Sequence, residues 1–181
     1  MRLQRDTRAA HDRLDAALAR IDLGSASGLA AFLQVQAEGF AMLRAGLGDG
    51  AGDPGLAPGL SDLLDEMTAA LAADVGPVAR PAQVPPLSPD AVAYVTLGSR
   101  LGTRALAQRW AAGVAGSRYF ALPSRGAEWR DLVARLSARP ATGPAADRVT
   151  ADALTCFSLF DEAAERRGLA GSTRATVSSA A

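Results

Sequence analysis

Residues 88–114 read SPDAVAYVTLGSRLGTRALAQRWAAGV, and this stretch decides the fold class. Ser88 and Pro89 predict a helix start, because a hydroxyl suits the N-cap and proline suits the first turn. Asp90 then places a negative charge at the positive end of the helix dipole. No strand-like alternation follows, so the stretch predicts one long helix that ends near Val114.

The helical spacing of apolar residues predicts five further helices on either side of this stretch. Their expected ranges are 2–21, 25–47, 60–75, 126–138 and 151–167. The segments 48–59 and 76–87 are rich in glycine and proline and interrupt the pattern. Six helices joined by such loops predict an all-α, single-domain helical bundle over residues 1–167. The small, polar residues 168–181 predict a disordered tail.

Details of the helices also follow from the residue types. Ser25 or Ser27 is expected to cap the second helix, and Thr150 the last one. Tyr119 and Phe120 are expected on a loop after the long helix. The inward faces of the last two helices are expected to carry Trp129, Leu132, Val133 and Leu136, and then Leu154, Phe157, Phe160 and Ala164.

Composition excludes several functional classes. The 19 basic and 19 acidic side chains of the 181 residues cancel, so no strongly basic field indicates nucleic acid. The N-terminus lacks the apolar core of a signal peptide, and no apolar run is long enough to span a bilayer. Cys156 has no partner for an internal disulfide, which fits a reducing compartment. We therefore expect a soluble, cytoplasmic protein that binds neither nucleic acid nor a membrane.

Cys156 and His11 are each the single residue of their type. Cys156 lies in an apolar helical pattern, which is typical of an inert core residue rather than a reactive thiol. His11 shares helical spacing with Thr7 and Leu14, so we expect it to face inward. There it could be a core histidine bonded to a neighbouring oxygen. Periodicity alone favours this interpretation. The residue could also ligate the iron of a haem, which needs only one protein ligand, whereas a zinc site needs three or four.

Gly98 and Gly102 lie four residues apart and so share one face of the long helix. A glycine inside a helix costs about 1 kcal/mol relative to alanine, so the pair requires a reason. One explanation is a flat or bulky ligand that approaches the backbone. The other is close packing of a second helix.

Two motifs together resemble a known family. The first is Leu3-x-x-x-Thr7-Arg8-x-x-His11-x-x-Leu14-Asp15, and the second is Tyr94-Val95-x-x-Gly98-Ser99-x-Leu101-Gly102. They resemble the proximal and distal helices of bacterial haem oxygenases, most closely the bacteriophytochrome-associated type. Later residues fit the same order, namely Phe120, Trp129, Leu132, Leu136, Ala153 and Phe157. The resemblance covers most of residues 3–167.

The resemblance implies a site and an activity. His11 would be the proximal iron ligand, and Gly98 and Gly102 would leave room for oxygen on the distal side, where Ser99 could anchor ordered water. Arg8 and Arg130 match basic positions that would hold the haem propionates, although each could be an ordinary solvated arginine. Haem would be both cofactor and substrate, and biliverdin, carbon monoxide and iron would be the products. The expected partners are an electron donor, such as ferredoxin or a flavoprotein reductase, and a biliverdin-using phytochrome.

Two residues depart from the family pattern. Thr103 stands where many relatives have a second glycine, and Leu97 where bacterial members often have glutamate. A working oxygenase would need Thr103 to turn away from the haem or to join the distal water network. The departures favour an alternative, a non-catalytic haem-binding or partner-binding protein of the same fold. A third interpretation is a purely structural helical domain in which His11 and the glycines only pack.

Overall fold

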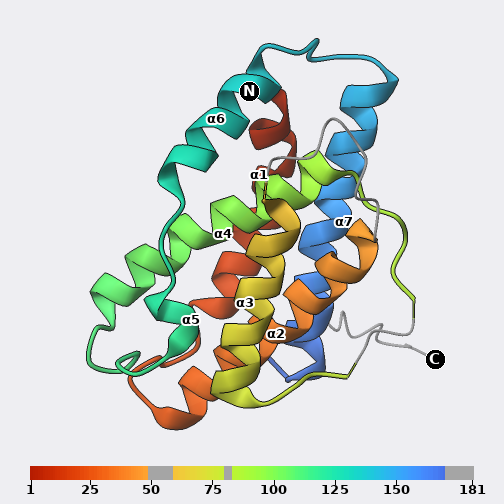
Figure 1. The fold of residues 1–181 in the computed structure, drawn as a ribbon. Helices are drawn as coiled ribbons and strands as arrows, with labels where there is room; N and C mark the ends of the chain where they lie inside the picture. Colours follow the sequence, from red (N-terminus) through yellow and green to blue (C-terminus); the bar gives the residue numbers. More distant parts are fainter. Residues whose placement is uncertain (49–58, 80–82, 170–181) are drawn as a thin grey trace, which may run out of the picture.

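The computed structural model describes residues 1–48, 59–79 and 83–169, and these residues form seven helices and no strand. The helices are α1 (Arg2–Leu18), α2 (Ala26–Leu47), α3 (Leu60–Val75), α4 (Pro89–Arg109), α5 (Arg118–Ala121), α6 (Gly126–Ser137) and α7 (Pro144–Arg166). They form one bundle (Figure 1), which confirms the predicted all-α architecture. None of the described helices is both long and apolar enough to cross a membrane. The predicted tail lies outside the described residues from position 170 onwards.

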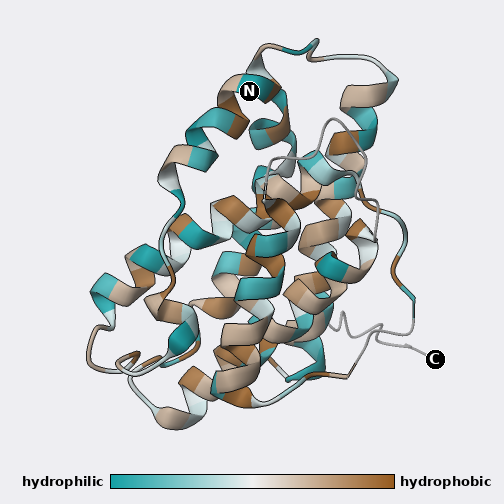
Figure 2. Ribbon diagram, viewed as in Figure 1, coloured by the Kyte–Doolittle hydropathy of each residue, from teal (hydrophilic) through white to brown (hydrophobic). Residues whose placement is uncertain are grey.

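The core centres on α2 and α7. The helix α7 packs against α1, α2 and α4, while α2 also packs against α3. Phe40 of α2 is fully buried and meets Phe160 of α7 edge-on, with ring centroids 5.1 Å apart. A Cβ on the neighbouring Gly39 would come within 2.2 Å of the Phe160 ring, so only glycine permits this approach. Figure 2 shows the mixture of hydrophobic and hydrophilic residues along each helix that amphipathic packing requires.

Several helix boundaries match the sequence prediction and others do not. The range of α3 is as predicted, and Ser25 caps α2 by accepting a hydrogen bond from the Gly28 amide. The helix α1 ends at Leu18, before the predicted Ile21, and α4 ends at Arg109 rather than near Val114. Beyond α4 the chain turns back onto the segment before α2. Gly113 lies there against the Leu23 carbonyl, which a Cβ would approach within 2.3 Å.

The start of α7 corrects the prediction for Thr150. The helix begins at Pro144, so Thr150 lies inside it and donates its hydroxyl to the Ala146 carbonyl. Leu154 is 39% exposed rather than inward, because the buried stripe runs through its neighbours Ala153 and Cys156. Cys156 is fully buried, and burial raises the pKa of its thiol to about 12, which favours an inert core residue.

Tyr119 and Phe120 lie on the short helix α5 and not on a loop. The carboxylate of Asp74, at the end of α3, accepts hydrogen bonds from the Ser117 hydroxyl and from the amides of Arg118 and Tyr119. These bonds satisfy the free amides of the first turn of α5. The local signal for this helix is Ser117, whose hydroxyl caps it by accepting from the Phe120 amide. Its other anchor, Asp74, lies on another helix and could not be predicted from local sequence.

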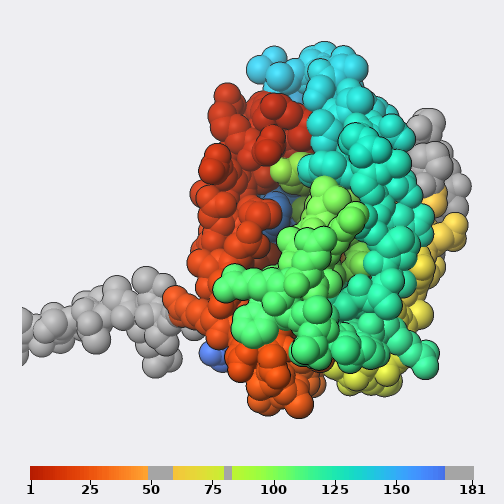
Figure 3. Space-filling view, turned by 90° about the vertical axis from the view of Figure 1, so that its left-hand side faces the viewer, coloured from red at the N-terminus to blue at the C-terminus, as the bar shows by residue number. Residues whose placement is uncertain are grey.

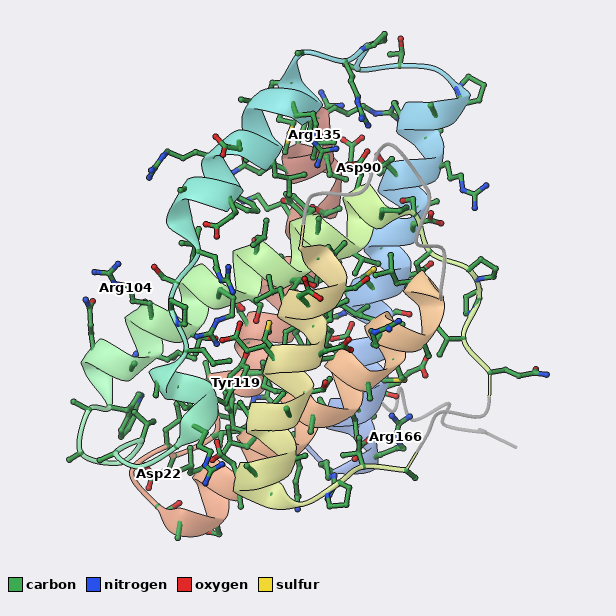
Figure 4. The ribbon with its side chains drawn as sticks, in the orientation of Figure 1. Asp22, Asp90, Arg104, Tyr119, Arg135 and Arg166 are labelled. Carbon is green, nitrogen blue, oxygen red and sulfur yellow. The ribbon has the colours of Figure 1, made fainter. Side chains whose placement is uncertain are left out.

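The start of α4 is held by residues of two other helices. The Ser88 hydroxyl does not cap the helix, contrary to prediction; instead the Ser88 amide donates to Asp152 of α7 at 2.8 Å. Asp90 is 7% exposed, and its carboxylate accepts from Arg135 at 2.5 Å and from Arg139. Figure 4 shows Asp90 and Arg135 side by side where α4 meets α6. Asp90 therefore joins α6 to α4 besides compensating the helix dipole.

We expect Asp90→Asn to lower the free energy of unfolding by about 2 kcal/mol, because a hydrogen bond to a charged group usually contributes about this much to stability. Urea denaturation of the purified variant measures the change. Asp131→Asn is the matched control, because Asp131 is an exposed residue of α6. Equal stability of both variants would contradict the role of Asp90.

Candidate functional site

A cavity of about 790 Å³ opens between α1 and α4. Figure 3 shows it as a hollow between the red surface of α1 and the green surface of α4, with blue α7 visible in its depth. Residues of α2, α6 and α7 complete its walls. Binding sites for cofactors and small molecules usually have volumes of about 300–1,000 Å³, so this cavity has the size of a ligand site.

His11 lies in the wall that α1 contributes to this cavity. The prediction that it shares the buried stripe is wrong, because its side chain is 56% exposed. The buried stripe of α1 runs instead through Thr7, Ala10 and Leu14. His11 follows Ala10 by one residue, or about 100° around the helix, which turns it from the core to the cavity. Its ring meets the edge of Phe157 at 5.8 Å between centroids.

Two carboxylates face one nitrogen of the His11 ring. Nδ1 lies 3.3 Å from Asp15 Oδ2, one helical turn later, and 3.8 Å from Asp12 Oδ1. No hydrogen bond within the described residues involves Nε2. Partial burial raises the pKa of the Asp15 carboxyl, His11 opposes this rise and Asp12 adds to it. A carboxylate at Nδ1 is the arrangement that orients an imidazole to bind a metal through Nε2.

Gly98 and Gly102 lie in the α4 wall of the same cavity. A Cβ on Gly102 would meet no atom of the described residues within 4 Å. A Cβ on Gly98 would contact the Trp129 ring at 3.5 Å, an ordinary van der Waals distance. Close packing of a second helix therefore does not explain Gly102, and the space above it belongs to the cavity.

The next residues of α4 divide between the cavity and the core. Ser99 and Thr103 line the cavity, whereas Leu97 is buried in the core at 4% exposure. The departure from the family pattern at Leu97 therefore does not alter the cavity wall. The Thr103 hydroxyl donates to the Ser99 carbonyl at 2.8 Å and lies 3.3 Å from the Tyr119 hydroxyl.

The two predicted arginines lie in different places. Arg8 lines the cavity, and its side chain is 80% exposed, with Nε 3.6 Å from Asp12 Oδ2. Arg130 is exposed on α6 and is not part of the cavity wall. Sequence reasoning missed Gln4 and Arg5, which also line the cavity one turn from Arg8. Their spacing from His11 on one helix was the available signal.

Several aromatic side chains line the cavity. They come from α2, α4, α6 and α7 and are Phe32, Tyr94, Trp129, Phe157 and Phe160. Of the α6 residues predicted to face inward, Leu132 alone is buried, while Trp129, Val133 and Leu136 are half-buried. Trp129 lies against Tyr94, with ring centroids 5.4 Å apart, and so forms a wall rather than part of the core. The cavity thus combines an aromatic interior with basic residues near the N-terminus of α1.

No protein-family model matches the sequence, and no curated protein matches it. Within the described residues, no group of three or more histidine, cysteine, aspartate or glutamate side chains could hold a metal ion. Inferences about function therefore depend on the cavity and its residues.

We expect Gly102→Ala to raise the free energy of unfolding by about 1 kcal/mol, because alanine is the better helix former and has open space there. Gly39→Ala is the contrasting variant, because its Cβ would collide with Phe160. Overpacking of this kind costs about 1–3 kcal/mol. Urea denaturation of both variants measures the difference, and a comparable loss at Gly102 would contradict the open space.

Proposed function

We propose that this protein is a haem oxygenase-type monooxygenase that binds haem between α1 and α4. The observation that carries the proposal is the composition of one cavity. His11, the only histidine, lies in one wall, and Gly102 with open space above its Cα lies in another. Resemblance of the same two helices to the proximal and distal helices of haem oxygenases supports this assignment.

The residues of the cavity fit a haem group. Nε2 of His11 would hold the iron, with Asp15 orienting the ring from Nδ1. The aromatic interior suits the porphyrin plane, and Arg5 and Arg8 suit carboxylates at the cavity mouth. Arg130 is not brought to the cavity, so we assign it no part in the proposal.

Haem, when bound, would supply the iron that activates dioxygen against the porphyrin edge, giving biliverdin, carbon monoxide and iron. The protein's own residues would hold and shield the group. Gly98 and Gly102 would leave space on the distal side, and Ser99 would hold ordered water there. The electrons would come from an external donor such as ferredoxin or a flavoprotein reductase. A cytoplasmic location and delivery of biliverdin to a phytochrome belong to the same proposal.

A spectral titration with hemin tests the proposal most directly. We expect the protein to shift the Soret band, and His11→Ala to lose that spectrum because no second histidine can replace the ligand. Added imidazole should restore the spectrum of the variant, which a purely structural role of His11 would not permit. An unchanged spectrum and affinity in His11→Ala would contradict the proposed iron ligand.

Asp15→Asn should weaken hemin binding about tenfold or more, because loss of a carboxylate partner of a ligating histidine typically has this effect. Asp12→Asn is the matched control, because Asp12 lies farther from Nδ1. Hemin dissociation constants from Soret titrations measure both. A larger effect at Asp12 than at Asp15 would mean that the proposed orientation of His11 is wrong.

A second candidate is a non-catalytic haem-binding protein of the same fold. The observation that favours it is Thr103, which lines the cavity at a position where many haem oxygenases have glycine. Adding a reductant to the hemin complex in air separates the two candidates. Loss of the Soret band with formation of biliverdin supports the enzyme, and a stable reduced complex supports the binding protein.

A further inference from the structure

A chain of buried polar side chains ends at the cavity wall. It runs from Thr103 on α4 through the Tyr119 hydroxyl to Gln36 on α2. The Tyr119 hydroxyl lies 3.3 Å from Thr103 Oγ1 and donates to Gln36 Oε1 at 3.2 Å. All three side chains are at most 4% exposed, and Gln36 and Thr103 line the cavity.

Tyr119 is fixed by contacts on several sides. The Arg100 guanidinium lies 4.8 Å from the centre of its ring, and the Phe40 and Phe120 rings also pack against it. Its amide bonds to Asp74, as described for α5. Figure 4 shows Tyr119 where α5 meets the bundle. A hydroxyl held in this way can fix the orientation of the Gln36 carboxamide.

Once the hydroxyl hydrogens of this chain are assigned to acceptors, the Gln36 amide nitrogen remains free to donate. The single hydroxyl hydrogen of Thr103 has two acceptors, the Ser99 carbonyl at 2.8 Å and the Tyr119 hydroxyl at 3.3 Å, and Tyr119 donates its own hydrogen to Gln36 Oε1. No hydrogen bond within the described residues uses the amide nitrogen of Gln36. The nitrogen has no hydrogen-bond partner and is not fully buried. Because Gln36 lines the cavity, this nitrogen is accessible there.

We infer that the Gln36 amide is the hydrogen-bond donor to a small ligand or ordered water beside the Gly98 and Gly102 face of the cavity. Tyr119 is its positioning residue. The inference rests on the proposed haem-binding function and adds a residue from α2 to the distal side. A neutral donor that is already oriented stabilises negative charge on a ligand without reorganising.

Fluoride binding to the ferric hemin complex tests this role without turnover, because fluoride is a small anion that accepts hydrogen bonds. We expect Gln36→Leu and Tyr119→Phe each to raise the fluoride dissociation constant roughly tenfold, equivalent to about 1.4 kcal/mol. Gln36→Glu, which places a carboxylate there, should weaken fluoride binding further. Gln34→Leu is the matched control on α2, because Gln34 bonds to Arg167 and does not line the cavity.

The outcomes separate this inference from the proposed function. Unchanged hemin affinity with weaker fluoride binding in Tyr119→Phe supports a positioning role, because Tyr119 does not line the cavity. Normal fluoride binding in both Gln36→Leu and Tyr119→Phe overturns the inference and leaves haem binding intact. Weaker fluoride binding in Ser99→Ala, with normal binding in the Gln36 and Tyr119 variants, would likewise overturn the inference and leave haem binding intact. Absence of a Soret shift in the unaltered protein overturns the proposed function and this inference with it.

Discussion

The contact between Phe160 of α7 and the backbone of α2 at Gly39 is the constraint on which the bundle depends. A side chain at position 39 would require the two helices to separate, because even a Cβ would lie 2.2 Å from the ring. With glycine there, Phe160 packs edge-on against Phe40 and brings α7 into the centre of the fold. The same ring reaches the cavity wall, so the central packing also sets the depth of the cavity.

The cavity exists because α7 supports α1 and α4 independently. Both helices pack against α7, and α4 is further tied by Asp152 at its start and by Asp90 to α6. The inner faces of α1 and α4 therefore need not fill the space between them. Thr7 bridges the two helices through the Tyr94 hydroxyl at 3.4 Å, and beyond this contact the walls diverge around the aromatic interior.

Local sequence signals predicted the parts of the fold that local interactions determine. Ser25 and the range of α3 followed from capping and periodicity. The helix α5 did not, because it has four residues and only Ser117 as a local cap, while its other anchor, Asp74, lies on α3. Helical spacing placed His11 on the inward stripe, which was wrong, because spacing on one helix could not distinguish the core from the edge of a cavity. The cavity requires the positions of α2, α6 and α7, which no spacing on α1 contains.

The glycines show why sequence alone left the function open. Gly39 and Gly102 are both glycines inside helices, and their propensity cost is the same. At position 39 the missing side chain admits another helix, and at position 102 it leaves empty space above the backbone. The polar atoms around that space are largely satisfied within the protein, since Thr7 and Thr103 bond to carbonyls of their own helices. Among the described residues that line the cavity, the groups left for a ligand include Nε2 of His11 on one wall and the Gln36 amide nitrogen on another. An imidazole nitrogen can bind a metal and an amide N–H requires an acceptor, so haem with a small bound anion or diatomic would use both groups, whereas a purely apolar guest would use neither.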